Sequence, residues 1–437
     1  MKAAPVVRLR GVVQHYDWGG CDFIPHLLGL RNPSRQPFAE LWMGAHPKAP
    51  SLVEIAAAAA STPSAPDESI RISPGTVGLD RLLERSGEQI VGPQHARFAG
   101  GLPYLFKILD VARMLSIQAH PTKAQAELGY ARENAAGIPL DAPNRNYKDE
   151  NHKPETGIAL TDFWMLHGFR PLAEIADTLE HTPELRPLMP EFAARLQSRD
   201  LGEAGKRELL RDLYRGAMTM PQEEVDRLLS RLLTRLRAGP PPDEASPDYW
   251  TLQAAADFPL PGGHLDRGIF SIYLLNLVRL RPGQGTFQPA ACLHAYLRGV
   301  MVELMANSDN VLRGGLTRKH VDTAELLRVL DFESGRPEIL DGRQISATER
   351  IYRTPAQEFQ LSRIVAVEET PHEGCAGQGP EILLMLEGRA ELRAGGEALA
   401  LSRGSIVLAP YGTDYRIESR DGAATIFKAS LPDRARI

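Results

Sequence analysis

Residues 115–120 show a strict alternation of apolar and polar side chains, in the stretch LSIQAH. Successive side chains of a strand point to opposite faces, so Ser116, Gln118 and His120 are expected on one face. Pro121 then ends the strand, because proline cannot donate a hydrogen bond to a ladder. The pattern predicts a strand over 115–120 that presents a hydroxyl, an amide and an imidazole together. Polar strand faces are often only solvated, so the alternation alone does not distinguish a binding site from a surface.

Other apolar stretches predict a mainly β protein. Residues 300–306, VMVELMA, alternate and place Glu303 inside a strand. The last hundred residues form short apolar stretches separated by turn residues, such as EILLMLEG and SIVLAP. Short strands at close spacing with glycine turns are typical of a small antiparallel barrel. The strands around residues 115–120 and 294–306 are expected to form a similar barrel, so the chain would hold two.

Between these β regions, residues 171–240 have a helical pattern. Apolar residues recur at three- and four-residue steps and define one face of an amphipathic helix, namely Val225, Leu228, Leu229, Leu232, Leu233 and Leu236. Arginines occupy much of the opposite face, which we interpret as solvated. The stretch GPPPDE at 239–244 closes this part. We expect a helical insertion at 171–259, a first β domain from 1–170 and 260–335, and a C-terminal β domain at 336–437.

Composition and charge limit the classes of partner. The chain has 437 residues, 43% hydrophobic and 24% charged, with a formal net charge of -5. Nothing in that balance attracts nucleic acid or an anionic membrane, so we expect neither as a partner. The 3 cysteines, Cys21, Cys292 and Cys375, are odd in number and far apart, which argues against a disulfide framework. With no apolar signal segment at the N-terminus, a cytoplasmic location is expected. Residues 52–100, rich in Ala, Ser and Pro at first, are expected to form short helices and loops.

Four polar side chains could together hold a metal ion. His120 and His294 offer imidazole nitrogens, Glu155 offers a carboxylate and Gln118 offers an amide oxygen. This mixture suits a borderline divalent ion, with zinc first. Structural zinc usually has cysteine ligands, and none is used here, so the set predicts a site with room for water or a substrate oxygen. Glutamine is the weakest of the four by its chemistry.

Positive charge lies near the same stretches. Lys153 stands between His152 and Glu155, and Arg313 and Lys319 lie in a loop after Glu303. Arginine binds a phosphate or an enediolate through two hydrogen bonds, lysine acts as a point charge, and the Ser116 hydroxyl can donate to phosphate. Taken alone, these cations also suit an ordinary surface loop.

Two aromatic motifs near the N-terminus leave two interpretations open. Trp18 lies in HYDWGG, and Glu40 lies with His46 in AELWMGAHPKAPS. Core aromatics and structural polar contacts are the first interpretation of these residues, and contact with a substrate is the second.

Five motifs in order, AELWMGAHPKAPS, LSIQAHP, NHKPE, HAYLRG and MANSDNVLRGGLTRK, together resemble the type I mannose-6-phosphate isomerase (phosphomannose isomerase) family of the cupin superfamily. The resemblance runs from YDWG at 16–19 to about residue 335. It implies cupin-type barrels, with the first β domain catalytic. Two departures concern the loops beside the site: Arg318 stands where proline is usual, and Cys292–Leu293 precede His294 where a threonine or glutamate and a proline are common.

Carried over by motif, the resemblance implies one Zn²⁺ per chain, bound by Gln118, His120, Glu155 and His294. It also implies that Arg313 is an active-site residue. The positions that it places at the sugar or the phosphate are Ser116, Lys153, Lys319, Trp18 and Glu40.

The resemblance further implies an aldose–ketose isomerase of carbohydrate metabolism that interconverts mannose 6-phosphate and fructose 6-phosphate through a cis-enediol. The base that moves the proton between C1 and C2 stays open among Glu303, Asp309 and Lys153. A metal-dependent cupin oxygenase and a sugar-phosphate-binding cupin without turnover are the alternatives. The expected partner is a small hexose 6-phosphate, and a monomer is the working expectation for the oligomeric state.

Overall fold

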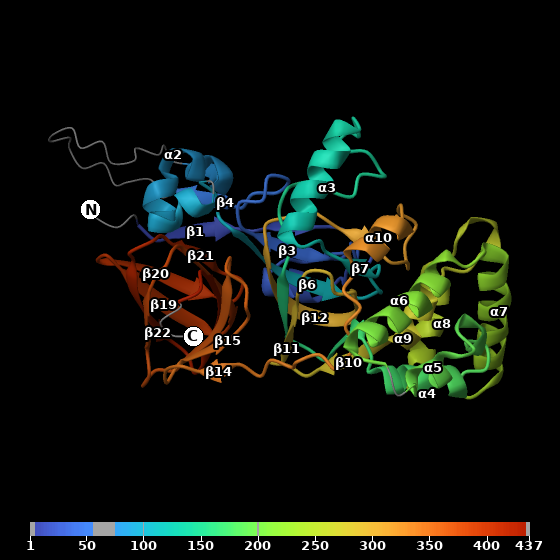
Figure 1. The fold of residues 1–437 in the computed structure, drawn as a ribbon. Coiled ribbons are helices and arrows are strands. Elements are labelled where there is room, and N and C mark those ends of the chain that lie inside the picture. The colour runs from blue at the N-terminus through green and yellow to red at the C-terminus, as the bar shows by residue number, and fades with distance from the viewer. Residues whose placement is uncertain (1–4, 56–74, 99, 199–200, 434–437) are drawn as a thin grey trace.

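The computed structural model describes residues 5–55, 75–98, 100–198 and 201–433. Part of the alanine-rich stretch after residue 52 lies outside these ranges. The described chain forms a central β region, a group of helices at one end and a C-terminal β region at the other (Figure 1). All pairs of named strands are antiparallel, and the helices of the insertion come between strands of the central sheet. The predicted mainly β class with a helical insertion is therefore confirmed.

The central sheet has ten strands, and its main path runs β10-β9-β12-β6-β3-β2. Its strands are β2 (Val12–Gln14), β3 (Glu40–Met43), β6 (Tyr104–Val111), β7 (Gln118–Ala119), β8 (Glu155–Ala159), β9 (Phe163–Phe169), β10 (Leu275–Leu280), β11 (Gly285–Gln288), β12 (His294–Ala306) and β13 (Leu312–Arg313). The long strand β12 pairs with β6, β7, β8 and β9. As predicted, Glu303 lies inside a strand, on β12.

The strand predicted over 115–120 is much shorter than expected. Only Gln118 and Ala119 have ladder pairs, opposite His294 of β12 and opposite β13. Around them the backbone makes single bonds, from Leu115 N to Tyr296 O and from Ile117 N to the carbonyl of Gly315. The segment is held by isolated contacts on both sides of a two-residue ladder, so the expected long strand is wrong.

The C-terminal β region consists of a nine-stranded and a four-stranded sheet. The nine strands are, in sheet order, β14 (Arg343–Gln344), β15 (Glu349–Tyr352), β16 (Gln360–Ala366), β23 (Ala424–Ser430), β18 (Glu381–Glu387), β21 (Ile406–Ala409), β1 (Val7–Arg10), β4 (Leu52–Ile55) and β5 (Gly75–Gly78). The four are β17 (His372–Cys375), β22 (Asp414–Ser419), β19 (Arg389–Ala394) and β20 (Glu397–Ser402). In the described residues these sheets are open rather than closed barrels, which corrects that part of the prediction.

Three N-terminal strands join the C-terminal sheet. Val7 of β1 pairs with Leu408 of β21, and β4 and β5 extend the same ladder. The chain begins in one β region, crosses to the other and returns at its end. The domain boundaries at 170, 259 and 335 stay a prediction, and this pairing is a contact that the expected division did not include.

Helices fill the space beside the sheets. They are α1 (Phe23–Leu27), α2 (Leu79–Val91), α3 (Lys123–Ala135), α4 (Leu172–His181), α5 (Phe192–Leu196), α6 (Glu203–Thr219), α7 (Gln222–Ala238), α8 (Pro247–Asp257), α9 (Ile269–Leu274) and α10 (Thr323–Val329). Helix α7 buries the six apolar side chains that the sequence pattern placed on one face, so this prediction is confirmed. Helices α4 to α9 share one core with the end of the central sheet that carries Ile117 and Leu312. That core supports the candidate site from behind.

Candidate active site

Three of the predicted metal ligands meet in the interior of the central β region. A ligating atom from each of His120, Glu155 and His294 lies within 4.8 Å of the other two. Glu155 begins β8, His294 begins β12 and His120 directly follows β7. The Nε2 atoms of His120 and His294 lie 3.4 and 3.3 Å from the two Glu155 carboxylate oxygens. All three residues are at most 4% exposed, so the cluster is screened from bulk water.

The two imidazoles are oriented by backbone carbonyls. His120 Nδ1 lies 2.7 Å from the carbonyl oxygen of Asn310, and His294 Nδ1 lies 3.1 Å from that of Cys292. A ring nitrogen that donates to a carbonyl leaves the other nitrogen with its lone pair free for a metal. Burial, with a smaller effect of Lys153, lowers the pKa of His120 to about 4. This histidine is therefore neutral at physiological pH, as a metal ligand must be.

An unsatisfied buried nitrogen in the cluster supports a bound zinc ion. The Nε2 atom of His120 is buried and has no hydrogen-bond partner among the described residues. A buried polar atom without a partner costs free energy, and it is rare in native proteins unless a ligand or ion satisfies it. Two imidazole nitrogens and a carboxylate are the ligands that catalytic zinc sites use, with one position left for water or substrate. The donor set and the unsatisfied atom are both consistent with such an ion.

Gln118, the fourth predicted ligand, lies in register with the cluster. Its ladder partners are His294 on one side and Arg313 on the other. Residues directly opposite each other in an antiparallel sheet share a face. Gln118 Nε2 donates to Ser116 Oγ at 3.3 Å, which leaves the amide oxygen as the atom available to an ion. Ser116 and Gln118 thus lie together beside the cluster.

Glu155 is held as a carboxylate. Burial opposes its ionisation, but Lys153 and the two histidines outweigh burial and hold its pKa well below the usual range. Lys153 Nζ lies 2.8 Å from a Glu155 oxygen. The lysine therefore balances the charge of the carboxylate, and its ammonium is already engaged in this ion pair.

Lys107, which the sequence analysis did not select, lies at the centre of a second buried charge network. Its ammonium lies 3.1 Å from Glu303 and 3.3 Å from Glu40. The Tyr296 hydroxyl donates to Glu303 at 2.9 Å. Burial opposes the charge on Lys107, but the two carboxylates outweigh it and raise the pKa of the lysine. The available signal was a single lysine within the apolar strand YLFKILDV.

Asp309, another candidate base, follows the end of β12 and is engaged at the edge of the site. Lys48 lies 2.9 Å from its carboxylate, and His46 Nε2 lies 3.6 Å from it. Burial opposes ionisation of Asp309, but these contacts lower its pKa below the ordinary value. By contrast, burial raises the pKa of Glu303. The structure thus gives the two carboxylates different environments.

Arg313 is a cation of the site that has no ion-pair partner among the described residues. It is half-buried, and no hydrogen bond or ion pair engages its guanidinium within the described part of the chain. Burial alone lowers its pKa, with no carboxylate near enough to oppose the effect. Burial lowers the pKa of Lys319 and of Lys148, and the nearby charges of Arg313 and Lys48 lower it further. Four cations therefore gather here, a setting that suits an anionic ligand.

Of the two N-terminal candidates, Glu40 belongs to the charge network around Lys107 and Trp18 lies near it. Glu40 is buried and pairs with Lys107, as described above. Trp18 packs beside the apolar cluster around Met301 and stacks on Tyr16 with ring centroids 5.8 Å apart. The charge of Glu40 acts on the Tyr16 hydroxyl, whose pKa burial raises. The aromatic pair therefore lies close to the charge network.

Comparison with known proteins identifies the family. Residues 6–172 match the family model described as the phosphomannose isomerase type I catalytic domain. The chain is 39% identical over 401 residues to the mannose-6-phosphate isomerase of Escherichia coli (strain K12), an alignment that covers 91% of this chain and 93% of the relative. The chain belongs to the type I phosphomannose isomerase family. Mannose-6-phosphate isomerase 2 of Arabidopsis thaliana, 31% identical over 98% of this chain and 94% of its own length, is a plant member of the family.

Solved structures of phosphomannose isomerases share the whole fold. A zinc-bound mannose 6-phosphate isomerase superposes with a TM-score of 0.82 at 34% identity, over 98% of this chain and 100% of that one. A variant of the phosphomannose isomerase from Salmonella typhimurium gives a TM-score of 0.83 at 33% identity with the same coverage. The resemblance predicted from the five motifs is thereby confirmed. Among the described residues, no helix is both long and apolar enough to cross a membrane.

Proposed function

We propose that this phosphomannose isomerase family member interconverts mannose 6-phosphate and fructose 6-phosphate, with one Zn²⁺ per chain bound by Gln118, His120, Glu155 and His294. The observation that supports the proposal best is the buried cluster of three ligating side chains within 4.8 Å, beside an unpaired arginine. When bound, a zinc ion supplies a Lewis acid that polarises a sugar oxygen. The remaining steps are assigned to side chains of the chain itself.

Arg313 is assigned to the negative charge that develops on the sugar oxygen as the enediolate forms. A preorganised donor aimed at developing charge acts mainly in the transition state. No carboxylate competes for its guanidinium, so all of its N–H donors are available to the substrate. Lys319 and Ser116 are assigned to the phosphate, whose binding energy holds the reacting carbons in place. Lys153, Trp18 and Glu40 stay predicted substrate contacts.

Glu303 is proposed as the base that carries the proton between C1 and C2. A general base works best when its pKa lies near the working pH. Asp309 is paired with Lys48, which favours its ionised form, and Lys153 is occupied by Glu155. Glu303 is also paired, with Lys107, but burial outweighs that contact and raises the pKa of Glu303, which increases its proton affinity. Lys107 and Tyr296 would act as positioning residues that hold this carboxylate.

A coupled assay of mannose 6-phosphate conversion to fructose 6-phosphate tests the proposal. The zinc-loaded protein is expected to turn over, to lose activity with a chelator and to recover it when zinc is restored. Absence of turnover by the zinc-loaded protein would contradict the proposal. Oxygen consumption in the same mixture would instead favour the oxygenase, and sugar-phosphate binding without product would favour a binding protein. The cytoplasmic location and the monomeric state stay predictions.

A further inference from the structure

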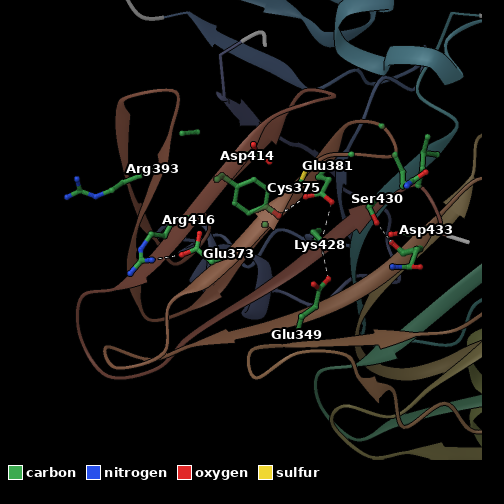
Figure 2. A pocket seen from close by; sticks show the side chains of 18 of the residues that line it. Glu349, Glu373, Cys375, Glu381, Arg393, Asp414, Arg416, Lys428, Ser430 and Asp433 are labelled. Carbon is green, nitrogen blue, oxygen red and sulfur yellow. Dashed lines mark hydrogen bonds and ion pairs between the residues drawn. The ribbon is translucent and has the colours of Figure 1, made fainter. Parts of the chain in front are cut away.

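A second polar cavity lies in the C-terminal β region, away from the ligand cluster. It has a volume of about 620 Å³ and is bounded by strands of both C-terminal sheets (Figure 2). Glu349, Glu381 and Lys428 line it from the nine-stranded sheet, and Tyr415 and Cys375 line it from the four-stranded sheet. The volume exceeds what a single hexose fills, so a small molecule has room there.

The inner wall of this cavity is a buried charge network. Lys428 Nζ lies 2.8 Å from Glu349 and 3.4 Å from Glu381. The Tyr415 hydroxyl donates to Glu381 at 2.6 Å, and Figure 2 shows these groups joined in one chain of contacts. All four residues are at most 6% exposed. Buried charges are costly, and here they line the wall of a cavity.

The same set of groups occurs in the central β region. There Lys107 lies between two carboxylates, Glu40 and Glu303, and a tyrosine hydroxyl donates to one of them. In the C-terminal region Lys428, two glutamates and Tyr415 repeat this arrangement. The chain thus contains two β regions that each hold a lysine–diglutamate–tyrosine network. Only the first network lies beside the metal-ligand cluster, because no second three-ligand cluster occurs in the described residues.

The cavity also contains an acceptor with no partner in the protein. Gln360 lines it, and its Oε1 atom is buried without a hydrogen-bond partner among the described residues. An unsatisfied buried acceptor is costly unless a ligand or water donates to it. The cavity therefore contains several hydrogen-bond acceptors, namely the carboxylates and this amide oxygen. It also contains a donor, the Lys428 ammonium. Neighbouring hydroxyl groups of a polyol both donate and accept, so they match such a mixture.

The charge at the mouth argues against an anionic ligand. Arg416 is paired with Glu373, and Arg393 lies 2.6 Å from Glu391. Asp414 adds a further exposed carboxylate. The arginines of this mouth are thus already paired, in contrast to Arg313 in the first site. A phosphate would meet carboxylates without gaining an unpaired cation.

We propose that this cavity is a second binding site, for an uncharged polyhydroxylated small molecule of about hexose size. Glu349, Glu381 and the Gln360 amide oxygen accept hydrogen bonds from its hydroxyl groups, and Lys428 donates to them. The site is distinct from the isomerase site in its location, its charge and its lack of a metal-ligand cluster. Its ligand is therefore a free sugar or sugar alcohol rather than a sugar phosphate.

Cys375 allows a direct test, because this exposed residue lines the cavity. The rate of its alkylation by iodoacetamide is measured by peptide mass spectrometry in the full-length zinc-loaded protein. The probes are D-mannose, D-glucose and mannitol, each titrated separately. We expect at least one probe to slow alkylation of Cys375 several-fold and saturably, with no change at Cys21. Absence of protection by all three, or equal slowing at Cys21, would overturn the proposal.

A variant that narrows the cavity controls for non-specific protection. Gly377 lines the mouth, and a Cβ at this exposed position would meet only the Cys375 sulfur, at 3.5 Å. Gly377→Trp is expected to abolish saturable protection while isomerase activity and the melting temperature stay unchanged. Glu381→Gln, which keeps the side-chain shape, is expected to weaken the protection. Protection that survives in both variants would contradict the proposal, as would stronger protection by mannose 6-phosphate than by mannose.

Discussion

Lys107 and Glu303 lie directly opposite each other on β6 and β12, and their charged groups are 3.1 Å apart. The lysine is also 3.3 Å from Glu40, which lies on β3 at the other side of β6. Both carboxylates are buried, and each has this ammonium as its ion-pair partner. The network joins three neighbouring strands of the central sheet, next to the ligand cluster. It therefore contributes to stability and to the position of the proposed base.

Removing the lysine should be strongly destabilising. Lys107→Met leaves two buried carboxylates without a counter-charge, and breaking a buried ion pair costs about 3–5 kcal/mol. Urea unfolding at neutral pH measures the change. Lys206→Met, which removes an exposed pair with Glu203, should leave the unfolding free energy almost unchanged. Adding Glu303→Gln to Lys107→Met should recover part of the loss, and no recovery would contradict the assigned coupling.

Arg313→Ala should reduce turnover without releasing zinc. Loss of one donor aimed at developing charge typically costs about 10²–10³-fold in kcat. The predicted ligands are other residues, so metal content by mass spectrometry should be unchanged. The matched control is Arg318→Ala, an exposed arginine five residues further along the chain, which should retain most activity. A variant at Arg313 that kept full kcat would show that the enediolate is stabilised elsewhere.

His294 and His167 form a matched pair for the zinc assignment. They lie opposite each other on β12 and β9, but His167 Nε2 contacts the carbonyl of Phe287 at 3.0 Å and not the cluster. His294→Ala should therefore lose bound zinc and activity together. His167→Gln should retain zinc close to the level of the unchanged protein. Equal zinc content in the two variants would refute the assignment of His294 as a ligand.

Stability should fall in mild acid partly because of His167. Burial lowers its pKa to about 4, below the ordinary value of 6.5. Between these values the unfolded chain binds a proton that the folded chain does not, so stability falls as the pH decreases from about 6.5 to 4. In the zinc-free protein, His167→Gln should reduce the pH slope of the unfolding free energy by up to about one proton. A full pH slope in the His167→Gln variant would contradict this assignment.

The sequence alone determined the features that depend on local pattern. The three- and four-residue spacing of the apolar residues on α7 predicts one buried face from local sequence alone, and all six residues are buried in the structure. The turn-separated strands indicated a mainly β chain, and the five ordered motifs indicated the family. Three of the four predicted ligands, His120, Glu155 and His294, do meet in space.

Tertiary structure decided what depends on partners far apart in the chain. Lys107 looked like an isolated polar residue of an apolar strand, because its carboxylates come from positions 40 and 303. The strand predicted at 115–120 has only two residues, because β12 and β13 form ladder pairs only with Gln118 and Ala119. The N-terminal strand β1 joined the last sheet through pairing with β21, some four hundred residues away. The periodicity of side chains along the sequence predicts which face of a strand or helix a residue lies on. Which distant charged residue lies opposite it depends on how the chain folds.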